Sequence, residues 1–419
     1  MCFLSGERMK RGASVKTKEV IVGVTGGIAA YKAAELVRLL VKEKVIVRVA
    51  MTQAATRFVT PLTFEALSGN RVVYDMFGQE GTVMDHIRWG QESDLIIIAP
   101  ATADFVGKMA HGIGDDFLST CVIAATAKIL VCPSMNDRMF MNPAVQDNLS
   151  MLRKRGVIVF EPGRGELACG TSGPGRLPEP VEILEQAKFL LSDQDLFGWK
   201  ILVSAGPTVE PIDPVRYISN RSSGKMGYAV ARAAARRGAE VVLVSGPTHL
   251  KAPRGVTFCP VKSAEEMHRL VFENREGCDI VIKAAAVSDY RPRACADQKI
   301  KKGADSLSLE LVRNPDILAC LGETKAATPC VLVGFAAETE NLLTNAEKKL
   351  KAKNLDMIVA NDVSSSDAGF ETDTNRVKFI YRDGRVEDAP LMTKDEVADQ
   401  VLDRAMALRE IGREHRSGN

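Results

Sequence analysis

The chain begins each of its two halves with the same local pattern, a buried strand followed by a glycine turn and a helix. In the first half, the strand Val20–Val24 runs into Gly26 and Gly27, and a helix is predicted over residues 28–42. Later strands, such as Leu95–Ala99, are continuous apolar runs rather than alternating ones. Continuous apolar strands are typical of parallel sheets that helices cover on both faces. The sequence therefore predicts an α/β fold.

The pattern restarts at Ile201–Ser204, after a short polar stretch. A chain of 419 residues is also longer than one hydrophobic core usually accommodates. Near its end, Asp383-Gly384 between two short apolar runs predicts a terminal hairpin. We expect two three-layer parallel-sheet domains, with a polar or disordered N-terminal extension over 1–18, a first domain over 19–191, a linker over 192–199 and a second domain over 200–419.

The charge balance and the cysteine pattern exclude several classes of protein. Lys+Arg 55 against Asp+Glu 53 gives a net charge of +2, which favours neither a nucleic-acid groove nor a polybasic membrane anchor. The sequence has no apolar run of the roughly 18 residues that a membrane-spanning helix needs, and no secretion signal. Nine scattered cysteines without a C-x-x-C pair argue against a disulfide framework and a structural zinc site. We therefore expect a cytoplasmic protein with neither nucleic-acid nor membrane partners.

The first glycine turn reads GVTGG and lacks the dinucleotide-binding spacing G-x-G-x-x-G. The second strand ends in Met51-Thr52, where a nicotinamide site would place Asp or Glu on the ribose. Hydroxyl groups at this position suit a phosphate or a flavin mononucleotide better. The alternative is structural, because any parallel α/β sheet has glycine at such turns.

A second glycine turn, Ser222-Ser223-Gly224-Lys225, resembles the end of a P-loop. Met226 replaces the required Ser or Thr, so the stretch is not a Walker A motif. Its backbone N–H groups can still hold a phosphate at the start of the following helix. The alternative is that Ser222 or Ser223 is simply the helix N-cap.

Polar residues in the first half follow the ends of buried strands. Pro100–Ala103 closes one strand and Pro133–Asn136 closes another, while His86 follows the acidic Asp85. Open α/β sheets bind ligands at the carboxyl ends of their strands. Cys169 lies in the Gly- and Pro-rich stretch 161–180, which predicts an irregular loop. A cysteine on such a flap can close over a site and deliver a proton or a nucleophile.

These motifs together resemble a known family. TGGIAAYK, His86, PATA, PSMNDRMF and the ACG of the flap are similar to the flavin-dependent cysteine decarboxylases. In the second half, SAGPTVEPIDPVRYISNRSSGKMGYA, AAAVSDYRP, QKIKK, NPDI, GFAAET and KNLDMIVANDV resemble phosphopantothenate–cysteine ligases. The chain thus resembles the bacterial bifunctional enzymes of coenzyme A biosynthesis. The resemblance implies a flavodoxin-like decarboxylase domain and a Rossmann-like ligase domain, and it implies a homo-oligomer.

For the first domain, the resemblance implies decarboxylation of 4'-phosphopantothenoylcysteine to 4'-phosphopantetheine with FMN as the electron sink. It implies that Asn136 binds the substrate carboxylate, that His86 acts as a base or orients the substrate, and that Cys169 protonates the enethiol intermediate. The residues implied to bind FMN are Gly26, Gly27, Thr52, Pro100, Ala101 and Thr102. The structural alternatives are a helix N-cap for Asn136, a satisfied core histidine for His86 and an inert loop thiol for Cys169.

For the second domain, the resemblance implies ligation of 4'-phosphopantothenate to L-cysteine with CTP, through an acyl-cytidylate. Lys299 matches the catalytic lysine and Asn220 the asparagine that handles the acyl-cytidylate. Mg2+ or Mn2+ is expected with the phosphates, although no metal ligand can be assigned. The positions implied to bind CTP are Asp289, Lys299, Pro315, Asp316, Ile317, Leu318, Phe335, Lys349 and Lys353. The alternatives are a solvated charge run for QKIKK and one solvated helix face for Lys349 and Lys353.

Two other classes of protein compete with the bifunctional enzyme. One is a regulatory flavoprotein related to the decarboxylase domain but without full activity. The joint presence of Asn136, His86 and Cys169 argues against this class. The other is a nicotinamide oxidoreductase, which the missing acidic residues after Met51 and Ser245 disfavour.

Overall fold

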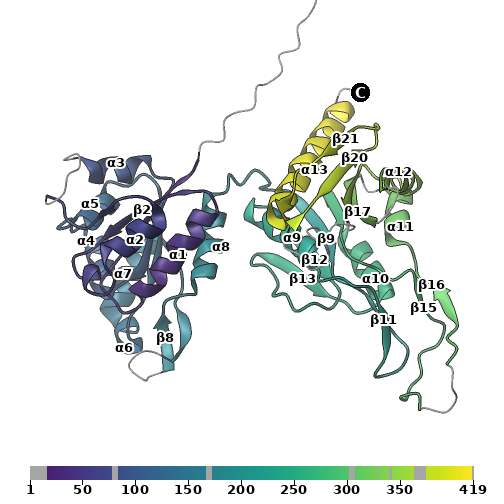
Figure 1. Cartoon of the computed structure of the whole chain (residues 1–419), viewed down its shortest axis with the longest axis horizontal. Helices are drawn as coiled ribbons and strands as arrows, with labels where there is room; N and C mark the ends of the chain where they lie inside the picture. The colour runs from purple at the N-terminus through teal and green to yellow at the C-terminus, as the bar shows by residue number, and fades with distance from the viewer. Residues whose placement is uncertain are drawn as a thin grey trace, which may run out of the picture. The chain divides into compact units, whose positions relative to one another are not determined.

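The computed structural model describes residues 17–77, 84–166, 172–301, 307–327, 329–338, 342–362 and 374–417. The chain folds as two compact units, Met1–Ser192 and Asp193–Asn419. Each unit is built on its own sheet (Figure 1).

The first domain contains a six-stranded sheet in the order β3-β2-β1-β4-β5-β6, with every neighbouring pair parallel. The predicted first strand is confirmed as β1, which pairs with β2 on one side and β4 on the other. The strands are β1 Glu19–Val24, β2 Ile46–Met51, β3 Val72–Val73, β4 Leu95–Ala101, β5 Lys128–Pro133 and β6 Ile158–Val159. The helices are α1 Ala30–Lys42, α2 Pro61–Ser68, α3 Asp85–Glu92, α4 Ala103–His111, α5 Phe117–Ile123, α6 Asp137–Phe140, α7 Pro143–Lys154 and α8 Pro180–Leu191, with a 3-10 turn at Ala55–Arg57.

Alternating residues of β1 and β4 enter two separate apolar layers. Val22 and Ile97 pack with α1, α2 and α8 on one face, whereas Ile21 and Ile98 pack with α3, α4, α5 and α7 on the other. Because both faces are covered, nearly every residue of these strands is buried. This arrangement confirms the predicted three-layer α/β fold.

The second domain contains an eight-stranded sheet in the order β13-β12-β9-β14-β17-β18-β20-β21. The six strands from β13 to β18 are parallel, and β20 and β21 add an antiparallel edge hairpin. The predicted terminal hairpin is therefore confirmed, with Gly384 in its turn at a φ of 89°. The strands are β9 Lys200–Ala205, β12 Glu240–Ser245, β13 Val256–Pro260, β14 Ile280–Lys283, β17 Val331–Glu338, β18 Met357–Asp362, β20 Val377–Tyr381 and β21 Val386–Asp388.

Helices cover both faces of this second sheet as well. α9 (Lys225–Arg236) and α13 (Lys394–Ser417) lie side by side on one face, where Val203 and Phe379 are buried (Figure 1). α10 (Ala264–Asn274), α11 (Ile317–Glu323) and α12 (Leu342–Ala352) cover the other. In both sheets the strand order reverses next to the first strand, between β1 and β4 and between β9 and β14. Ligands of open α/β sheets bind at such a reversal.

Part of the Gly- and Pro-rich stretch 161–180 is regular, so the prediction of an irregular loop is wrong there. β7 (Gly163–Glu166) pairs antiparallel with β8 (Ser172–Arg176). Gly175 explains how β8 can form, because a Cβ on Gly175 would overlap the carbonyl oxygen of Met135. The hairpin therefore packs directly on the segment that follows β5.

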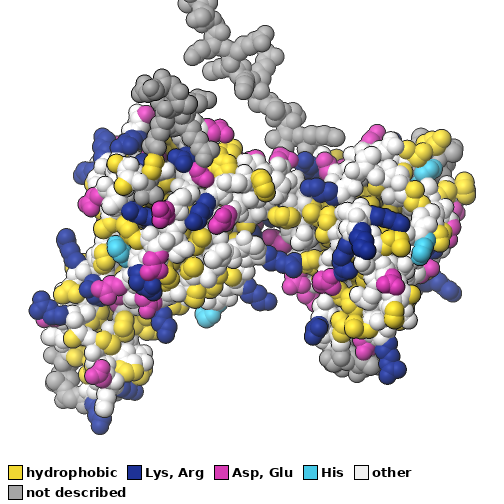
Figure 2. Space-filling view, turned by 180° about the vertical axis from the view of Figure 1, so that it is seen from behind, with side chains coloured by type: hydrophobic (Ala, Val, Ile, Leu, Met, Phe, Trp, Pro, Cys, Tyr) yellow, Lys and Arg dark blue, Asp and Glu magenta, His cyan; other side chains and the backbone are white. Residues whose placement is uncertain are grey.

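Three further short strand pairs were not predicted. β10 (Val209–Pro211) with β11 (Tyr217–Ser219), and β15 (Tyr290–Pro292) with β16 (Leu311–Arg313), extend from one end of the second domain (Figure 1). β19 (Thr374–Asn375) pairs with β22 (Met392–Thr393) near α13. On the face shown in Figure 2, basic and acidic side chains are interspersed over both domains. Among the described residues, no helix is both long and apolar enough to cross a bilayer.

Candidate functional site

Thr25 joins the ends of β1 and β4 in the first domain. Its buried hydroxyl donates to the carbonyl oxygen of Pro100 at 2.7 Å and accepts from the backbone N–H of Thr102 at 3.0 Å. Thr102 is in turn the N-cap of α4, and its side chain accepts from Phe105 N–H. These bonds hold the PATA turn against the first glycine turn. A Cβ on Gly27 would lie 3.5 Å from Thr102 Cγ2, an ordinary contact.

The end of β2 lies beside the same glycine turn. Thr52 N–H donates to Val24 O at 3.0 Å, and Thr52 O accepts from Ala55 N–H at 2.9 Å. A Cβ on Gly26 would overlap Ala54, so this close approach requires glycine. The structure therefore brings together all six predicted FMN positions, which are Gly26, Gly27, Thr52, Pro100, Ala101 and Thr102.

Asn136 lies just after the end of β5, next to the site formed by the first glycine turn, Thr52 and the PATA turn. Ser134 N–H donates to Ala101 O at 2.9 Å, and Met135 N–H donates to Gly175 O of β8 at 3.0 Å. The Asn136 side-chain oxygen accepts from Arg138 N–H at 2.9 Å, so Asn136 is the N-cap of α6. The alternative that Asn136 is a helix N-cap is thus confirmed. It does not exclude a binding role, because the cap uses the amide oxygen and the Nδ2 hydrogens are a separate donor group.

His86 and Cys169 are placed less fully. His86 is half-buried near the start of α3, and its ring meets Phe117 edge-on at 6.4 Å. Cys169 lies outside the described residues, between β7 and β8. Because β8 packs on Met135, the hairpin on either side of Cys169 is anchored beside Asn136.

In the second domain, Asn220 binds the segment that follows β14. Its Nδ2 donates to Val287 O at 3.0 Å and to Ala286 O at 3.4 Å. The next residues form the second glycine turn, and Gly224 has a φ of 74°. Gly224 itself is the N-cap of α9, without a side-chain cap bond, so the alternative that Ser222 or Ser223 caps this helix is wrong.

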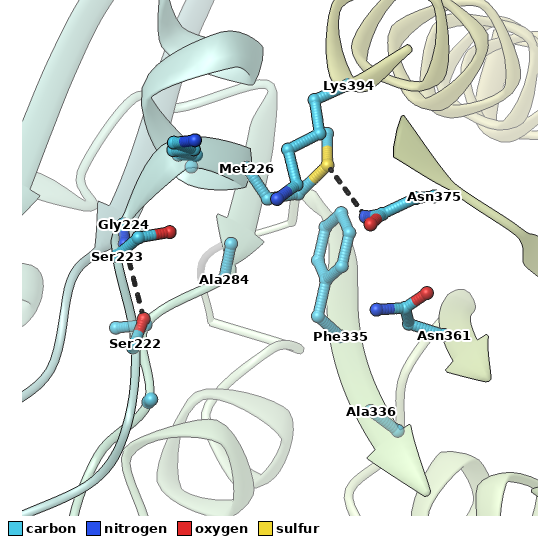
Figure 3. Close-up of a pocket in the computed structure, with 14 residues that line it drawn as sticks. Ser222, Ser223, Gly224, Met226, Ala284, Phe335, Ala336, Asn361, Asn375 and Lys394 are labelled. Atoms are coloured by element: carbon cyan, nitrogen blue, oxygen red, sulfur yellow. Dashed lines mark hydrogen bonds between the residues drawn. The ribbon is translucent and has the colours of Figure 1, made fainter. Parts of the chain in front are cut away.

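A pocket opens between this turn and the ends of β14, β17 and β18 (Figure 3). Asn361 and Asn375 contribute buried side-chain oxygens, which have no hydrogen-bond partner among the described residues. Nδ2 of Asn375 lies 3.7 Å from the sulfur of Met226. Of the predicted CTP residues, Phe335 lies in this pocket. Its lining comprises Ser222, Ser223, Gly224, Lys225, Met226, Gly227, Ala284, Ala285, Ala286, Phe335, Ala336, Asn361, Asn375 and Lys394.

Sequence reasoning missed Asn361, Asn375 and Lys394 as site residues. Asn361 carried a usable signal, because it is a polar residue at the end of a buried strand. Asn375 and Lys394 lie on later elements, β19 and α13, and only the fold brings them to the pocket. Lys394 is 7% exposed, so its stem forms part of the pocket wall.

Asp213 anchors the segment that carries Lys299. Its buried carboxylate accepts from the N–H groups of Val215, Arg216 and Ile300 at 2.8, 2.8 and 3.1 Å, and from Arg216 Nε at 3.0 Å. Burial alone would raise the pKa of this carboxyl, but the three backbone bonds and the guanidinium outweigh it and hold the pKa well below its usual range. The Lys299 side chain itself is exposed, while the backbone of the next residue, Ile300, is held by Asp213.

The NPDIL segment forms the N-terminus of α11. Asp316 caps the helix by accepting from Ala319 N–H at 3.0 Å, and it forms a 2.8 Å ion pair with Lys353. Burial acts to raise the pKa of Asp316, but the bonds from Lys353 and Ala319 lower it overall. Asn314, the first residue of the segment, donates its N–H to Asp289 O at 2.9 Å and so ties NPDIL to VSDY.

Lys349, in α12, and Lys353, which directly follows this helix, lie in different environments. Lys349 is exposed, whereas Lys353 is partly buried and paired with Asp316. The alternative of one solvated helix face is therefore wrong for Lys353. Within the described residues, no group of three or more His, Cys, Asp or Glu side chains could hold a metal ion.

Comparison with known proteins agrees with this division. Residues 8–191 match the Flavoprotein family, and residues 196–408 match the DNA/pantothenate metabolism flavoprotein C-terminal domain. The fold, with polar residues at the carboxyl ends of the strands in each sheet, thus defines a two-domain α/β protein whose first domain is of the flavoprotein family.

Full-length relatives narrow the class further. The coenzyme A biosynthesis bifunctional protein CoaBC of Vibrio cholerae is 45% identical over 392 residues, which are 93% of this chain and 98% of the relative. The Bacillus subtilis CoaBC is 46% identical over 399 residues, covering 94% and 98%. A crystal structure of a CoaBC C-terminal domain is 46% identical, covers 51% of this chain and 98% of its own, and has a TM-score of 0.44. The chain belongs to the family of bifunctional coenzyme A biosynthesis proteins.

Proposed function

We propose that this chain makes 4'-phosphopantetheine from 4'-phosphopantothenate and L-cysteine, by ligation in the second domain and decarboxylation in the first. One observation carries the proposal. In each domain of a chain of this family, polar residues gather at the carboxyl ends of the strands, where the strand order reverses. The proposed domain boundaries are those expected from the sequence, with the linker over 192–199.

In the ligase domain, the substrate carboxylate attacks the α-phosphorus of CTP, and pyrophosphate leaves. The amine of cysteine then attacks the acyl carbon of the cytidylate, and CMP leaves. Lys299 is proposed to stabilise the negative charge that develops on the phosphate, and Asn220 to hold the acyl-cytidylate. The bond network of Asp213 supports this role, because it holds the backbone next to Lys299.

The pocket at the second glycine turn is proposed to hold the nucleotide. N–H groups of Ser223–Lys225 suit a phosphate, and the unpartnered oxygens of Asn361 and Asn375 suit the amino group of cytosine. Phe335 would pack on the base. The remaining proposed CTP contacts are Asp289, Pro315, Asp316, Ile317, Leu318, Lys349 and Lys353. Mg2+ or Mn2+ would arrive on the triphosphate.

In the decarboxylase domain, the group formed by Gly26, Gly27, Thr52 and the PATA turn fits FMN, because the backbone segments approach closely there and threonine side chains at positions 52 and 102 lie beside them. FMN supplies the two-electron sink that lets the cysteinyl carboxylate depart as CO2. Asn136 would bind that carboxylate through Nδ2, and His86 would act as a base or orient the substrate. Cys169 would protonate the enethiol carbon.

We also propose a cytoplasmic homo-oligomer. The seven cysteines that the structure describes are free thiols, as suits a reducing compartment. Exposed apolar side chains gather on the hairpins that extend from the second domain, namely Tyr217, Tyr290 and Leu311. Such surfaces are common at interfaces between subunits.

Two readouts test the proposal. The purified protein should show a flavin absorption band, and it should release pyrophosphate from CTP only when 4'-phosphopantothenate is present. A protein without flavin would contradict the decarboxylase half. A flavin-containing protein that neither releases pyrophosphate nor decarboxylates 4'-phosphopantothenoylcysteine would instead be a regulatory flavoprotein.

A further inference from the structure

Lys394, the first residue of α13, is a buried lysine in the wall of the pocket at the second glycine turn. It is 7% exposed, and its side chain points into the pocket (Figure 3). An ammonium group is costly to bury unless polar or charged groups compensate it. The first turn of a helix is also an unfavourable place for a cation, because the helix dipole is positive there. Helix stability therefore does not explain a lysine at this position.

The start of α13 is fixed by other residues. The hydroxyl of Thr393 accepts from Glu396 N–H at 3.2 Å, and the Glu396 carboxylate accepts from Thr393 N–H at 2.9 Å. This reciprocal pair is a capping box, which satisfies the helix terminus without Lys394. The β19–β22 pairing, with Asn375 opposite Met392, ties the residues just before α13 to the pocket. The backbone that carries Lys394 is thus held beside the pocket.

Ion pairs align α13 with α9. Arg232 of α9 pairs with Asp395 of α13 at 2.5 Å. One turn further along both helices, Arg236 pairs with Asp399 at 2.6 Å. Because both residue numbers increase by four, the two helices run in the same direction, and their first residues meet at one pocket. Lys394 and the first turn of α9 accordingly line it together.

The start of α9 is open to a ligand, because Gly224 is its N-cap and provides no side-chain cap. The backbone N–H groups of a first helical turn carry partial positive charge and bind anions. The pocket adds the side chains of two lysines, Lys225 and Lys394. Among the described residues, its lining contains no acidic side chain. The charge of the pocket therefore favours an anion.

The side of the pocket formed by β18 and β19 has a different polarity. Asn361 and Asn375 present buried side-chain oxygens there, and neither oxygen has a hydrogen-bond partner among the described residues. Hydrogen-bond donors on a ligand would satisfy these oxygens. A ligand that carries phosphate at one end and an amino group elsewhere matches both sides of the pocket.

Resting on the proposed function, we propose that Lys394 binds a phosphate group in this pocket, together with the backbone N–H groups at the start of α9. A buried ammonium attracts a phosphate more strongly than an exposed one, because water screens the two charges less. Lys394 would hold a phosphorylated substrate of the ligation and take no part in making or breaking bonds. CTP and 4'-phosphopantothenate both carry phosphate, and their separate KM values distinguish the two sources.

Steady-state ligation by the full-length protein, with cytidine and inorganic pyrophosphate as inhibitors, tests this role. Lys394→Met should raise KM for CTP and Ki for pyrophosphate about 10- to 100-fold, because a charge-assisted hydrogen bond is lost. Ki for cytidine, which has no phosphate, should stay unchanged. Lys394→Arg keeps the charge and should restore most of the affinity for pyrophosphate. Lys262→Met, at an exposed lysine just before α10, is the matched control and should behave as the wild type.

A rise confined to KM for 4'-phosphopantothenate would support the phosphate role and assign the phosphate to that substrate. Unchanged KM values for both substrates would overturn the inference and leave the proposed function intact. An equal loss of affinity for cytidine and pyrophosphate would also overturn it, because such a loss indicates a distorted pocket.

A second measurement uses the wild type, in case thermal unfolding shows that Lys394→Met folds poorly. Lysine acetylation is followed by peptide mass spectrometry, and pyrophosphate or 4'-phosphopantothenate should protect Lys394 more than cytidine does. Equal acetylation of Lys394 with and without the two phosphate compounds would overturn the inference. A folded wild type that performs no ligation would instead contradict the proposed function, and this inference with it.

Discussion

The carboxylate of Asp213 accepts a hydrogen bond from the backbone N–H of Ile300 at 3.1 Å, which ties the segment carrying Lys299 to the turn between β10 and β11. The two segments are far apart in sequence. The contact fixes the backbone next to Lys299, whose side chain is exposed. Asp213 therefore fixes the backbone at Ile300, the neighbour of Lys299.

Asp213→Asn tests this relationship. The amide can accept fewer of these hydrogen bonds and cannot pair with Arg216, so we expect kcat for ligation to fall about 10- to 100-fold. Decarboxylation of added 4'-phosphopantothenoylcysteine should be unaffected, which controls for folding of the first domain. Ligation at the wild-type rate would show that Lys299 needs no such anchor.

The stability of the second domain carries a related prediction about pH. A carboxyl whose pKa is lowered on folding stabilises the fold at every pH above its unfolded value, and that contribution is lost as pH falls through the lower folded value. The difference in free energy of unfolding between the wild type and Asp213→Asn should therefore stay constant from about pH 5 to about pH 8 and narrow below about pH 4. Urea unfolding at a series of pH values measures this difference. A difference that widened as the pH fell would contradict the lowered pKa of Asp213.

Two single substitutions should separate the two half-reactions. Cys169→Ser should block decarboxylation and spare ligation, because serine does not readily deliver the required proton. Lys299→Gln should do the reverse, because it removes the positive charge that is proposed to stabilise the phosphate. Product analysis by mass spectrometry checks both, and each variant controls for the other. Full turnover to 4'-phosphopantetheine by Cys169→Ser would exclude the proton-donor role.

Gly26 and Gly27 offer a matched pair of substitutions. Gly26→Ala places a Cβ into Ala54, and we expect it to destabilise the first domain by about 1–3 kcal/mol and to reduce bound flavin. Gly27→Ala meets Thr102 at 3.5 Å and should leave the fold intact. Thermal unfolding and the flavin-to-protein absorbance ratio measure the two effects. Equal losses in both variants would contradict the geometry of this turn.

Asn361→Ala tests the nucleotide pocket. Loss of the buried amide should raise KM for CTP about tenfold without changing KM for 4'-phosphopantothenate. Asn274→Ala, at the C-terminal end of α10 in the same domain, is the control, since its side chain bonds to Leu270 O of its own helix. Steady-state ligation kinetics at varied CTP concentration would detect the difference. An unchanged KM for CTP would remove Asn361 from the nucleotide site.

The fold could be predicted because it depends on a local signal. Continuous apolar strands such as β1 and β4 are buried on both faces, and glycine follows at each strand-order reversal. The β7–β8 hairpin was missed because its regularity depends on Met135, a residue that follows another strand, and on glycines that usually indicate turns.

The candidate sites were predicted unevenly for a similar reason. Strand-end residues such as Thr52 and Thr102 are adjacent to recognisable strands, so their convergence follows from the parallel sheet. Asn375 gave no comparable signal, because it lies on a late, short strand that only the fold brings to the pocket. Local patterns therefore indicate where a sheet binds ligands, and tertiary packing decides which buried polar groups face the site.

The central claim is that one chain performs both reactions, and one measurement tests it directly. Purified protein is incubated with 4'-phosphopantothenate, L-cysteine, CTP and Mg2+, and the products are identified by mass spectrometry. We expect 4'-phosphopantetheine, with CMP, pyrophosphate and CO2 as by-products. Accumulation of 4'-phosphopantothenoylcysteine alone would contradict the decarboxylase half, and the absence of any product from a folded, flavin-containing protein would contradict the account as a whole.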